Sequence, residues 1–337
     1  MGISGLTILP GSTLVSEVIL PFLHGHGIEP RRIVEFQLGI ASRNYQVTDG
    51  CGKALVVRYD ERRTLDMMRE DRLLSECARK SGVRTPNGPW LEGESTCGTI
   101  VARPLIAGVA LPDLTPGIWP AATCLGGTLR RIHTAELPNV RRGFFYSGVI
   151  NRSREMRAKI DAAVNEMADT SDHVRLLREA VNRIDSIGFH QRELNRSPVS
   201  MVHGDYTPSN ILLSNGDIYV LDWEKACVGP TYSDLAQALF YFCAAIPDGV
   251  GSFTSEFISQ YEGDCATLGE ALRPWMVVYP AAIFLVDAVS AAVNRSRMGA
   301  EFNPRREVYF QSMSMQRFRR FIEIEEEMLA SIPRTKR

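Results

Sequence analysis

The stretch Met201-Val-His-Gly-Asp-Tyr-Thr-Pro-Ser-Asn210, followed by Ile211-Leu-Leu213 and then by Val220-Leu-Asp-Trp-Glu224, decides the fold of this chain. The apolar run after Asn210 predicts a strand, and Asn215-Gly216 is a pair typical of a tight hairpin turn. Residues 218–221 predict the returning strand. A hairpin of this kind brings positions 210 and 222 back to one rim.

Three oxygen-bearing side chains lie on this hairpin and on the loop before it. Asp205 precedes Asn210 by five residues, and Asp222 follows Asn210 by twelve. An aspartate placed in this way can accept a proton from a hydroxyl group, while an asparagine and a second aspartate supply the hard oxygen ligands that Mg²⁺ prefers. We therefore take Asp205 as the candidate catalytic base and Asn210 and Asp222 as candidate metal ligands.

The composition is that of an ordinary globular enzyme. The chain has 337 residues, 45% of them hydrophobic and 23% charged, and its formal net charge is −1. No global charge favours nucleic acid or an anionic membrane as a partner. Seven widely spread cysteines without a Cys-x-x-Cys pair favour reduced thiols in a cytoplasmic protein. The apolar stretch 275–293 contains Pro280 and Asp287, so we interpret it as a buried helix.

The order of expected elements divides the chain into two lobes. Segments 33–37, 45–48, 54–59 and 99–102 predict strands, and 64–80 predicts an amphipathic helix among them. After Pro104 to Gly108 the pattern is mainly helical, with helices expected at 119–134, 234–245, 253–261, 268–294 and 305–329, and with two helices expected within 152–187, divided around residues 170–172. We expect an α+β fold with a small β-rich lobe over residues 1–106 and a larger, mainly helical lobe over residues 107–337.

Together these features resemble the aminoglycoside phosphotransferase and choline kinase-like family, whose fold is related to that of the protein kinases. The resemblance covers roughly residues 30 to 300 and is strongest at His203-Gly-Asp205, at Asn210 and at Leu221-Asp-Trp-Glu224. The segment from Gly229 to Ala236 is similar to the one that follows the metal ligand in this family. The resemblance implies a bilobal protein-kinase-like fold, ATP and Mg²⁺ as cofactors, and a small-molecule kinase with an alcohol group as acceptor.

In the small lobe the resemblance implies a cation on the nucleotide phosphates. Arg58 ends the apolar run 54–57, at the place where kinase-like folds put that cation. Glu70 falls in the following helix and would pair with Arg58 to hold it forward. Arginine stands where the usual residue is lysine, which keeps the charge but changes its geometry to a planar fork. The alternative is a surface arginine and a surface glutamate that do not meet.

Other nucleotide contacts follow from the same resemblance. Ser42 and Asn44 belong to a loop with a single glycine that would cover the phosphates, in place of a Gly-x-Gly-x-x-Gly loop. Pro104 and Ile106 would hold the adenine through backbone hydrogen bonds, and a proline can still offer its carbonyl. A Walker-type loop is not supported, because Gly52-Lys53 leads into a strand.

Three further residues near the motifs can be interpreted structurally or functionally. His203 resembles a residue that braces the catalytic loop, and Asp234 either caps the helix that it begins or braces the same loop. Glu224 either assists a second metal or faces solvent.

The acceptor molecule is not identified by these motifs. Residues 231–300 contain seven acids and three basic residues, a local charge of −4, which would suit a cationic acceptor such as an aminoglycoside or a choline-like amine. Alternatively, the surplus of acidic residues could form a solvated surface that binds no acceptor. Asp287 interrupts an apolar helix, and it either binds the acceptor or pairs with Arg295 or Arg297.

Several functions stay open on the sequence alone. We favour an ATP- and Mg²⁺-dependent O-phosphotransferase acting on an aminoglycoside-type antibiotic, and thus an antibiotic resistance enzyme. The alternatives are a metabolic kinase for a sugar, choline or amino-alcohol, and a catalytically silent kinase-like binding protein. The complete set of Asp205, Asn210 and Asp222 favours turnover. A protein kinase is disfavoured, because no Asp-Phe-Gly and Ala-Pro-Glu pair encloses an activation segment.

Overall fold

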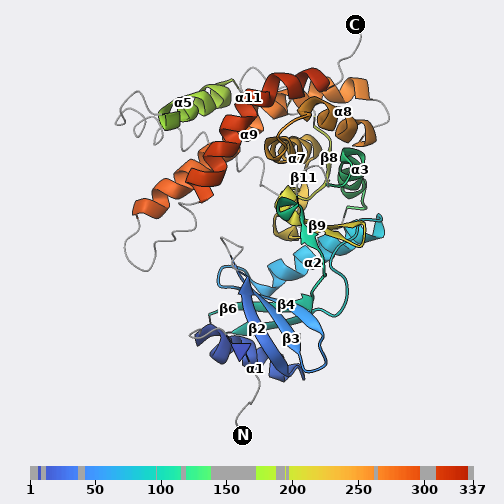
Figure 1. Cartoon of the computed structure of the whole chain (residues 1–337), viewed down its shortest axis with the longest axis vertical. Coiled ribbons are helices and arrows are strands. Elements are labelled where there is room, and N and C mark those ends of the chain that lie inside the picture. The colour runs from blue at the N-terminus through green and yellow to red at the C-terminus, as the bar shows by residue number, and fades with distance from the viewer. Residues whose placement is uncertain are drawn as a thin grey trace.

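Two lobes, each with its own hydrophobic core, make up the chain in the computed structural model (Figure 1). The structure describes residues 7–8, 13–36, 42–95, 97–114, 119–137, 172–186, 194, 197–261, 265–296 and 309–332. A sheet dominates the lobe formed by the first third of the chain, and helices dominate the other. The expected α+β fold with two unequal lobes is confirmed.

A six-stranded sheet forms the smaller lobe, in the order β1-β2-β3-β4-β6-β5. Its strands are β1 (Thr7–Ile8), β2 (Pro30–Phe36), β3 (Arg43–Asp49), β4 (Ala54–Asp60), β5 (Leu91–Ser95) and β6 (Gly98–Pro104). β1 pairs with β2 in parallel, and all other neighbours are antiparallel. The four strands predicted from the sequence are confirmed, whereas the short strands β1 and β5 were not predicted.

The alternation of side chains along β4 assigns the two faces of this sheet. Leu55, Val57 and Tyr59 are buried in a core shared with the π-helical turn η1 (Val15–Ile19) and with α1 (Leu20–Gly25). Val56 and Arg58 point to the opposite face and line a cavity there. That face is turned toward the larger lobe.

Helix α2 (Leu65–Lys80) lies between the sheet and the larger lobe (Figure 1). It begins after Thr64, whose hydroxyl oxygen accepts the N–H of Met67 at 3.3 Å, as an N-cap residue does. Gly82, with a φ of 86°, follows its last turn. The helix predicted over residues 64–80 is therefore confirmed almost to the residue.

The larger lobe is built from long helices around one core. They are α3 (Ala122–His133), α5 (Asp172–Asp185), α7 (Thr231–Ala245), α8 (Val250–Tyr261), α9 (Cys265–Ser296) and α11 (Met315–Ser331), the last preceded by the π-helical turn η7 (Tyr309–Ser314). Nearly every residue of α7 is buried, which makes it the central helix of the lobe. Each expected helix has a counterpart here, except that residues 152–171 lie outside the described part of the chain.

Short strands carry the motif segment, residues 201–224. β9 (Ile211–Ser214) and β10 (Asp217–Val220) form the predicted hairpin, with positive φ at both Asn215 (52°) and Gly216 (82°) in the turn. A second pair, β8 (Val199–Val202) with β11 (Cys227–Pro230), was not predicted. β7 (Val109–Ala110) also joins β9, whereas the six-stranded sheet ends at Pro104. These pairings support the lobe boundary that we propose at residue 106.

One helix among the described residues is long and apolar enough to cross a membrane, namely the stretch Ala271–Ala291 of α9. Its apolar window is 72% buried inside the lobe. Pro274 and Pro280 both lie within α9. The extensive burial matches the core helix predicted from the sequence.

Helices α3 and α8 are in close backbone contact at a glycine. A Cβ atom on Gly126 would lie 2.1 Å from the carbonyl oxygen of Phe257. We expect Gly126→Ala to lower the free energy of unfolding by about 2–4 kcal/mol, because backbone must move to relieve the overlap. Urea unfolding would measure this loss. Gly127→Ala is the matched control, because its Cβ would have no neighbour within 4 Å, and equal stability of the two variants would contradict the prediction.

Candidate active site

A buried carboxylate fixes the loop that carries Asp205. Asp234 of α7 accepts the N–H of His203 at 2.7 Å and the N–H of Gly204 at 2.8 Å. The Nε2 atom of His133 lies 3.0 Å from the same carboxylate. Burial alone would raise the pKa of Asp234, but His133 and the His203 N–H outweigh it and lower that pKa. Asp234 is thus a brace for the loop.

The ring of His203 joins this loop to the end of β10. Its Nδ1 accepts the N–H of Asp205 at 3.2 Å, and its Nε2 lies 3.0 Å from the carbonyl oxygen of Leu221. Since a carbonyl can only accept, Nε2 carries the proton and the ring is neutral. Burial lowers the pKa of His203, in agreement with this state. The side chain therefore positions Asp205 and the residue before Asp222, and its role is structural.

The hairpin brings the two expected metal ligands together. The N–H of Leu221 donates to the carbonyl oxygen of Asn210 at 2.8 Å, which places Asp222 beside Asn210. The Nδ2 atom of Asn210 donates to the carbonyl oxygen of Asp205 at 2.9 Å, so its Oδ1 remains for a cation. Asp222 has a φ of 57°, an unusual value for a residue with a Cβ and one that often accompanies function.

These donors fit a magnesium ion that is shared with a nucleotide. A carboxylate and an amide oxygen are hard ligands, and Mg²⁺ usually takes only one or two protein oxygens and completes its shell with phosphates and water. In the described part of the chain, no group of three or more His, Cys, Asp or Glu residues could hold a metal ion without additional ligands such as phosphates and water. Asn210 and Asp222 are therefore suited to a metal that arrives with phosphates.

Arg58 crosses from the small lobe to this rim. Its Nη1 lies 3.1 Å from Oδ1 of Asp222, and its Nη2 pairs with Glu224. Burial would lower the pKa of Arg58, but Asp222 and Glu224 raise it, so the guanidinium stays charged. This pairing assigns Glu224 a partner, where the sequence left its role open. The cation expected on the phosphates lies next to the expected metal ligands.

Asp71, one position after Glu70, is one of several α2 residues that line a cavity together with Arg58. Asp71 pairs with Arg63 at 2.5 and 2.8 Å, and Arg63 lies 3.8 Å from Glu224. Burial raises the pKa of Asp71 to about 6, against the effect of Arg63. Helix α2 is thus linked to the rim through charged side chains, while pairing of Glu70 with Arg58 stays a prediction.

A cavity of about 60 Å³ lies behind Arg58, between the two lobes. Val101 and Arg103 of β6 line it, and so do Asp222 and Trp223 from the larger lobe. Burial lowers the pKa of Arg103, a residue outside the sequence motifs. Arg103 immediately precedes the expected adenine contacts, Pro104 and Ile106, which are both half-buried.

The expected phosphate-covering loop is only partly described. Asn44 lies opposite Arg58 in the β3–β4 register, so both side chains face the same side of the sheet. The Nδ2 atom of Asn44 donates to Oγ of Ser42 at 3.4 Å. Residues 37–41 of this loop lie outside the described residues. The roles of Ser42 and Asn44 toward a nucleotide stay predictions.

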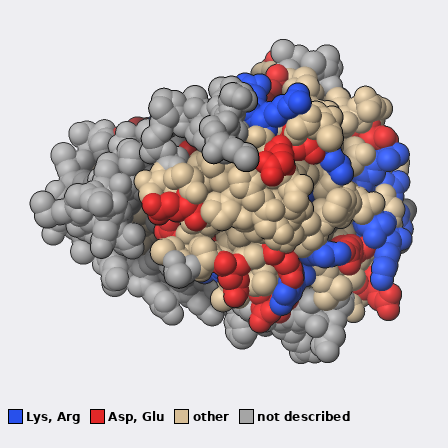
Figure 2. Space-filling model, turned by 90° about the horizontal axis from the view of Figure 1, so that it is seen from below, with Lys and Arg blue, Asp and Glu red and all other residues tan. Residues whose placement is uncertain are grey.

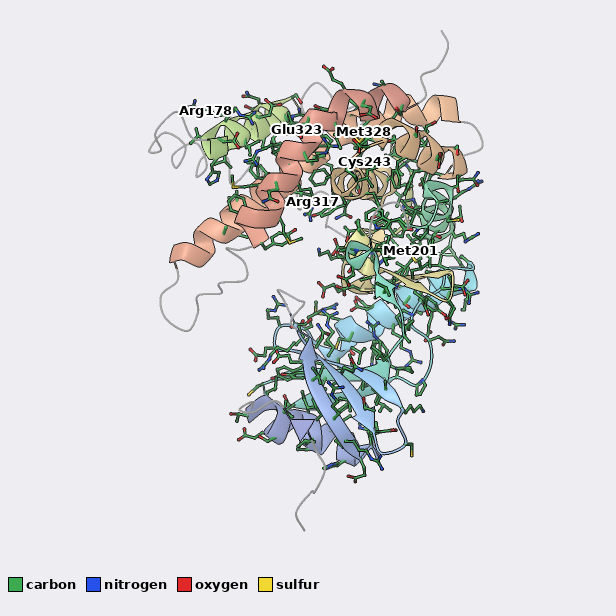
Figure 3. All side chains as sticks on the ribbon, viewed as in Figure 1. Arg178, Met201, Cys243, Arg317, Glu323 and Met328 are labelled. Carbon is green, nitrogen blue, oxygen red and sulfur yellow. The ribbon has the colours of Figure 1, made fainter. Side chains whose placement is uncertain are left out.

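A polar network lies where α9, η7 and α11 meet. Asp287 accepts the hydroxyl of Ser314 at 2.7 Å, and Nη1 of Arg317 lies 3.3 Å from the hydroxyl of Tyr309. The Arg317 guanidinium also lies 4.3 Å from the centre of the Tyr241 ring, a cation–π contact. Figure 3 shows Arg317 on the part of α11 nearer the small lobe than Glu323 and Met328. Arg295 and Arg297, the alternative partners of Asp287, have side chains outside the described residues.

We expect Asp287→Asn to flatten the pH dependence of stability. Burial raises the pKa of Asp287 from 3.8 to about 6, although the Ser314 hydroxyl opposes the shift. The folded chain therefore holds this proton more tightly than the unfolded chain, and the wild type loses stability as pH rises from about 4 to 6. Thermal unfolding across this range would measure the slope. Asp248→Asn, at an exposed position, should keep the wild-type slope, and an unchanged slope in Asp287→Asn would contradict the prediction.

The fold and the site define a kinase-like phosphotransferase. Residues 32–274 match the family model described as the phosphotransferase enzyme family. This match covers more than half of the chain, so the protein belongs to that family. The expected family and enzyme class, a phosphotransferase with an alcohol group as acceptor, are confirmed. No curated protein matches the chain.

Solved structures share the fold over nearly the whole chain. An aminoglycoside phosphotransferase, APH(4)-Ia, is 18% identical with a TM-score of 0.63, and the match covers 94% of this chain and 99% of that one. The amicoumacin kinase hAmiN, solved with AMP-PNP, Ca²⁺ and Ami, is 14% identical with a TM-score of 0.61 and 95% of each chain covered. A choline/ethanolamine kinase family protein from Mesorhizobium loti is 15% identical with a TM-score of 0.59, with 89% and 92% covered. These neighbours confirm the kinase-like fold.

Proposed function

We propose that this protein transfers the γ-phosphoryl group of Mg²⁺-bound ATP to a hydroxyl group of a small molecule, with Asp205 as the base. The observation that carries the proposal is that Asp205, Asn210, Asp222 and Arg58 lie along one rim. Nδ2 of Asn210 donates to the backbone carbonyl of Asp205 at 2.9 Å, and the N–H of Leu221, the residue before Asp222, donates to the carbonyl of Asn210 at 2.8 Å. Nη1 of Arg58 donates to Oδ1 of Asp222 at 3.1 Å. Each of these residues has the chemistry that its part in phosphoryl transfer requires. The chain thus has a candidate base, two candidate metal ligands and a candidate phosphate-binding cation, and this set disfavours a catalytically silent binding protein.

The reaction follows from where these groups lie. The acceptor hydroxyl gives its proton to the Asp205 carboxylate as its oxygen bonds to the γ-phosphorus, and the bond from that phosphorus to the β–γ bridging oxygen breaks, so that ADP leaves. Asn210 and Asp222 would hold Mg²⁺, which when bound neutralises phosphate charge. Arg58 offers its planar fork to the phosphates. No covalent phospho-enzyme forms.

The acceptor that we favour is an aminoglycoside-type antibiotic, and the alternative is a sugar, choline or an amino-alcohol. The names of the aminoglycoside phosphotransferase and the amicoumacin kinase support the first, and that of the choline/ethanolamine kinase family protein supports the second. The AMP-PNP and Ca²⁺ in the amicoumacin kinase structure support a nucleotide and a divalent cation. The acidic surplus does not decide between them, because Asp234 is a brace and Arg317 lies near Asp287.

Partners other than a small molecule are not part of the proposal. On the face seen in Figure 2, acidic and basic side chains together surround a broad uncharged area, which is no footprint for nucleic acid. The cysteines that the structure describes in full, six in number, are all free thiols. They support the cytoplasmic location that we propose.

A coupled ADP-release assay with ATP and Mg²⁺ tests the proposal. Hygromycin B, amicoumacin, choline, ethanolamine and a set of sugars would be offered one at a time, and mass spectrometry would identify a product with one added phosphoryl group. We expect at least one of these acceptors to raise ADP release well above the rate with water, and EDTA to abolish the increase. Binding of AMP-PNP without turnover on any acceptor would favour the silent binding protein instead.

A further inference from the structure

Lys225 is held beside the catalytic loop by its own backbone. It ends the 3₁₀ turn η5 (Trp223–Lys225), which starts directly after Asp222. A Cβ atom on Gly204 would lie 2.4 Å from the carbonyl oxygen of Lys225, so the two backbones are in contact just before Asp205. The chain then enters β11, which pairs with β8, the strand that leads into the loop. The position of Lys225 relative to Asp205 is therefore fixed from both sides.

The side chain of Lys225 ends at the expected base. Its Nζ lies 2.9 Å from Oδ2 of Asp205, and the two side chains are 36% and 18% exposed. Burial would lower the pKa of Lys225, but Asp205 outweighs it and raises that pKa, with smaller contributions from Glu224 and Asp222. Asp287 of α9 also interacts with it electrostatically. A lysine that keeps its proton cannot be a base, so it acts as a fixed cation.

This contact has a consequence for the geometry of proton transfer. A carboxylate has two oxygens, and the charge-assisted bond from Lys225 occupies Oδ2. We propose that Lys225 is a positioning residue, which fixes the Asp205 carboxylate so that Oδ1 receives the acceptor proton. The inference rests on the proposed function and adds to it a residue that acts through Asp205.

Two substitutions separate the charge of Lys225 from its bulk. Lys225→Met keeps the length of the side chain without its charge, and Lys225→Arg keeps the charge. With the acceptor that gives the fastest ADP release, we expect Lys225→Met to lower kcat about 10- to 100-fold, a part of what a general base contributes. The KM for Mg²⁺-bound ATP should stay within about twofold, and Lys225→Arg should restore most of kcat. Lys53→Met, at an exposed turn, is the matched control.

The split between kcat and nucleotide affinity distinguishes positioning from a merely structural role. A residue that positions the base should change kcat while the affinity for Mg²⁺-bound AMP-PNP and the midpoint of thermal unfolding stay close to their wild-type values. Lys53→Met should retain wild-type kcat. Wild-type kcat in Lys225→Met would overturn the proposal, as would a loss of kcat accompanied by an equal loss of AMP-PNP affinity and thermal stability.

The ion pair can also be tested without any acceptor. We expect amine acetylation of Lys225, followed by peptide mass spectrometry, to be slow in the wild type and faster in Asp205→Asn, while Lys53 reacts equally in both. Equal rates at Lys225 in the two proteins would overturn the pairing. Absence of ADP release by the wild type with every acceptor would refute the proposed function itself. If the wild type turns over an acceptor and Lys225→Met has the same kcat, only the role of Lys225 would be refuted.

Discussion

Replacement of Asp205 by asparagine should lower kcat by about 10²- to 10⁴-fold, the range that general-base assistance contributes. Asparagine keeps the shape of the side chain but cannot accept the hydroxyl proton. The loop itself should not move, because Asp234 and His203 hold it through backbone atoms. The affinity for Mg²⁺-bound AMP-PNP should therefore change little. Coupled ADP release and calorimetric titration would measure the two quantities separately.

The control for this substitution lies on the same hairpin. Asp217 is on β10, at the end remote from Asp222, and pairs with Arg84 at 3.1 Å with 40% of its side chain exposed. Asp217→Asn removes a carboxylate from the motif region without approaching the rim, so it should retain wild-type kcat. If Asp205→Asn were equally active, Asp205 would not be the base.

The parts of the fold that the sequence predicts are those set by local patterns. The hairpin follows from two apolar runs around Asn215-Gly216, and both turn residues have the positive φ that this pair tolerates. Helix α2 follows from its apolar spacing and from Thr64 at its start. Strands β8 and β11 were missed because each is four residues long and pairs across an interval of some twenty-five residues. A strand of that length carries little periodicity of its own.

The same distinction between local and distant contacts applies to the site. The spacing of Asp205, Asn210 and Asp222 could be read directly, since all three lie on one loop and hairpin. Asp71 could also have been found from helical spacing, because it lies three residues after Met68 and four before Ser75, both of which are buried. Lys225 could not, because its contact with Asp205 depends on the pairing of β8 with β11.

Arg58 shows a further limit of sequence reading. Alternation along β4 places it on the face turned toward the larger lobe, but its partner Asp222 is 164 residues further along the chain. The contact exists only because the lobes meet at that point. It also means that the expected phosphate cation and the expected metal ligand contact each other directly in this structure. A nucleotide that binds through Arg58 and through a metal ion on Asp222 must therefore compete with the contact between these two side chains.

This competition gives Asp222→Ala two effects that can be measured separately. Loss of the carboxylate should remove the Mg²⁺-dependent part of nucleotide affinity, about 10- to 100-fold or more, because outer-shell changes alone have effects of that size. In EDTA the same variant should bind AMP-PNP as well as or better than the wild type, since Arg58 then has one carboxylate fewer beside it. Calorimetric titration with and without Mg²⁺ would show both changes. Glu224→Gln is the matched control, because it removes a different carboxylate from beside Arg58 but leaves the Asp222 ligand in place, so its affinity should still rise with Mg²⁺. Equal Mg²⁺ dependence in Asp222→Ala and the wild type would exclude Asp222 as a ligand and leave it only as a partner of Arg58.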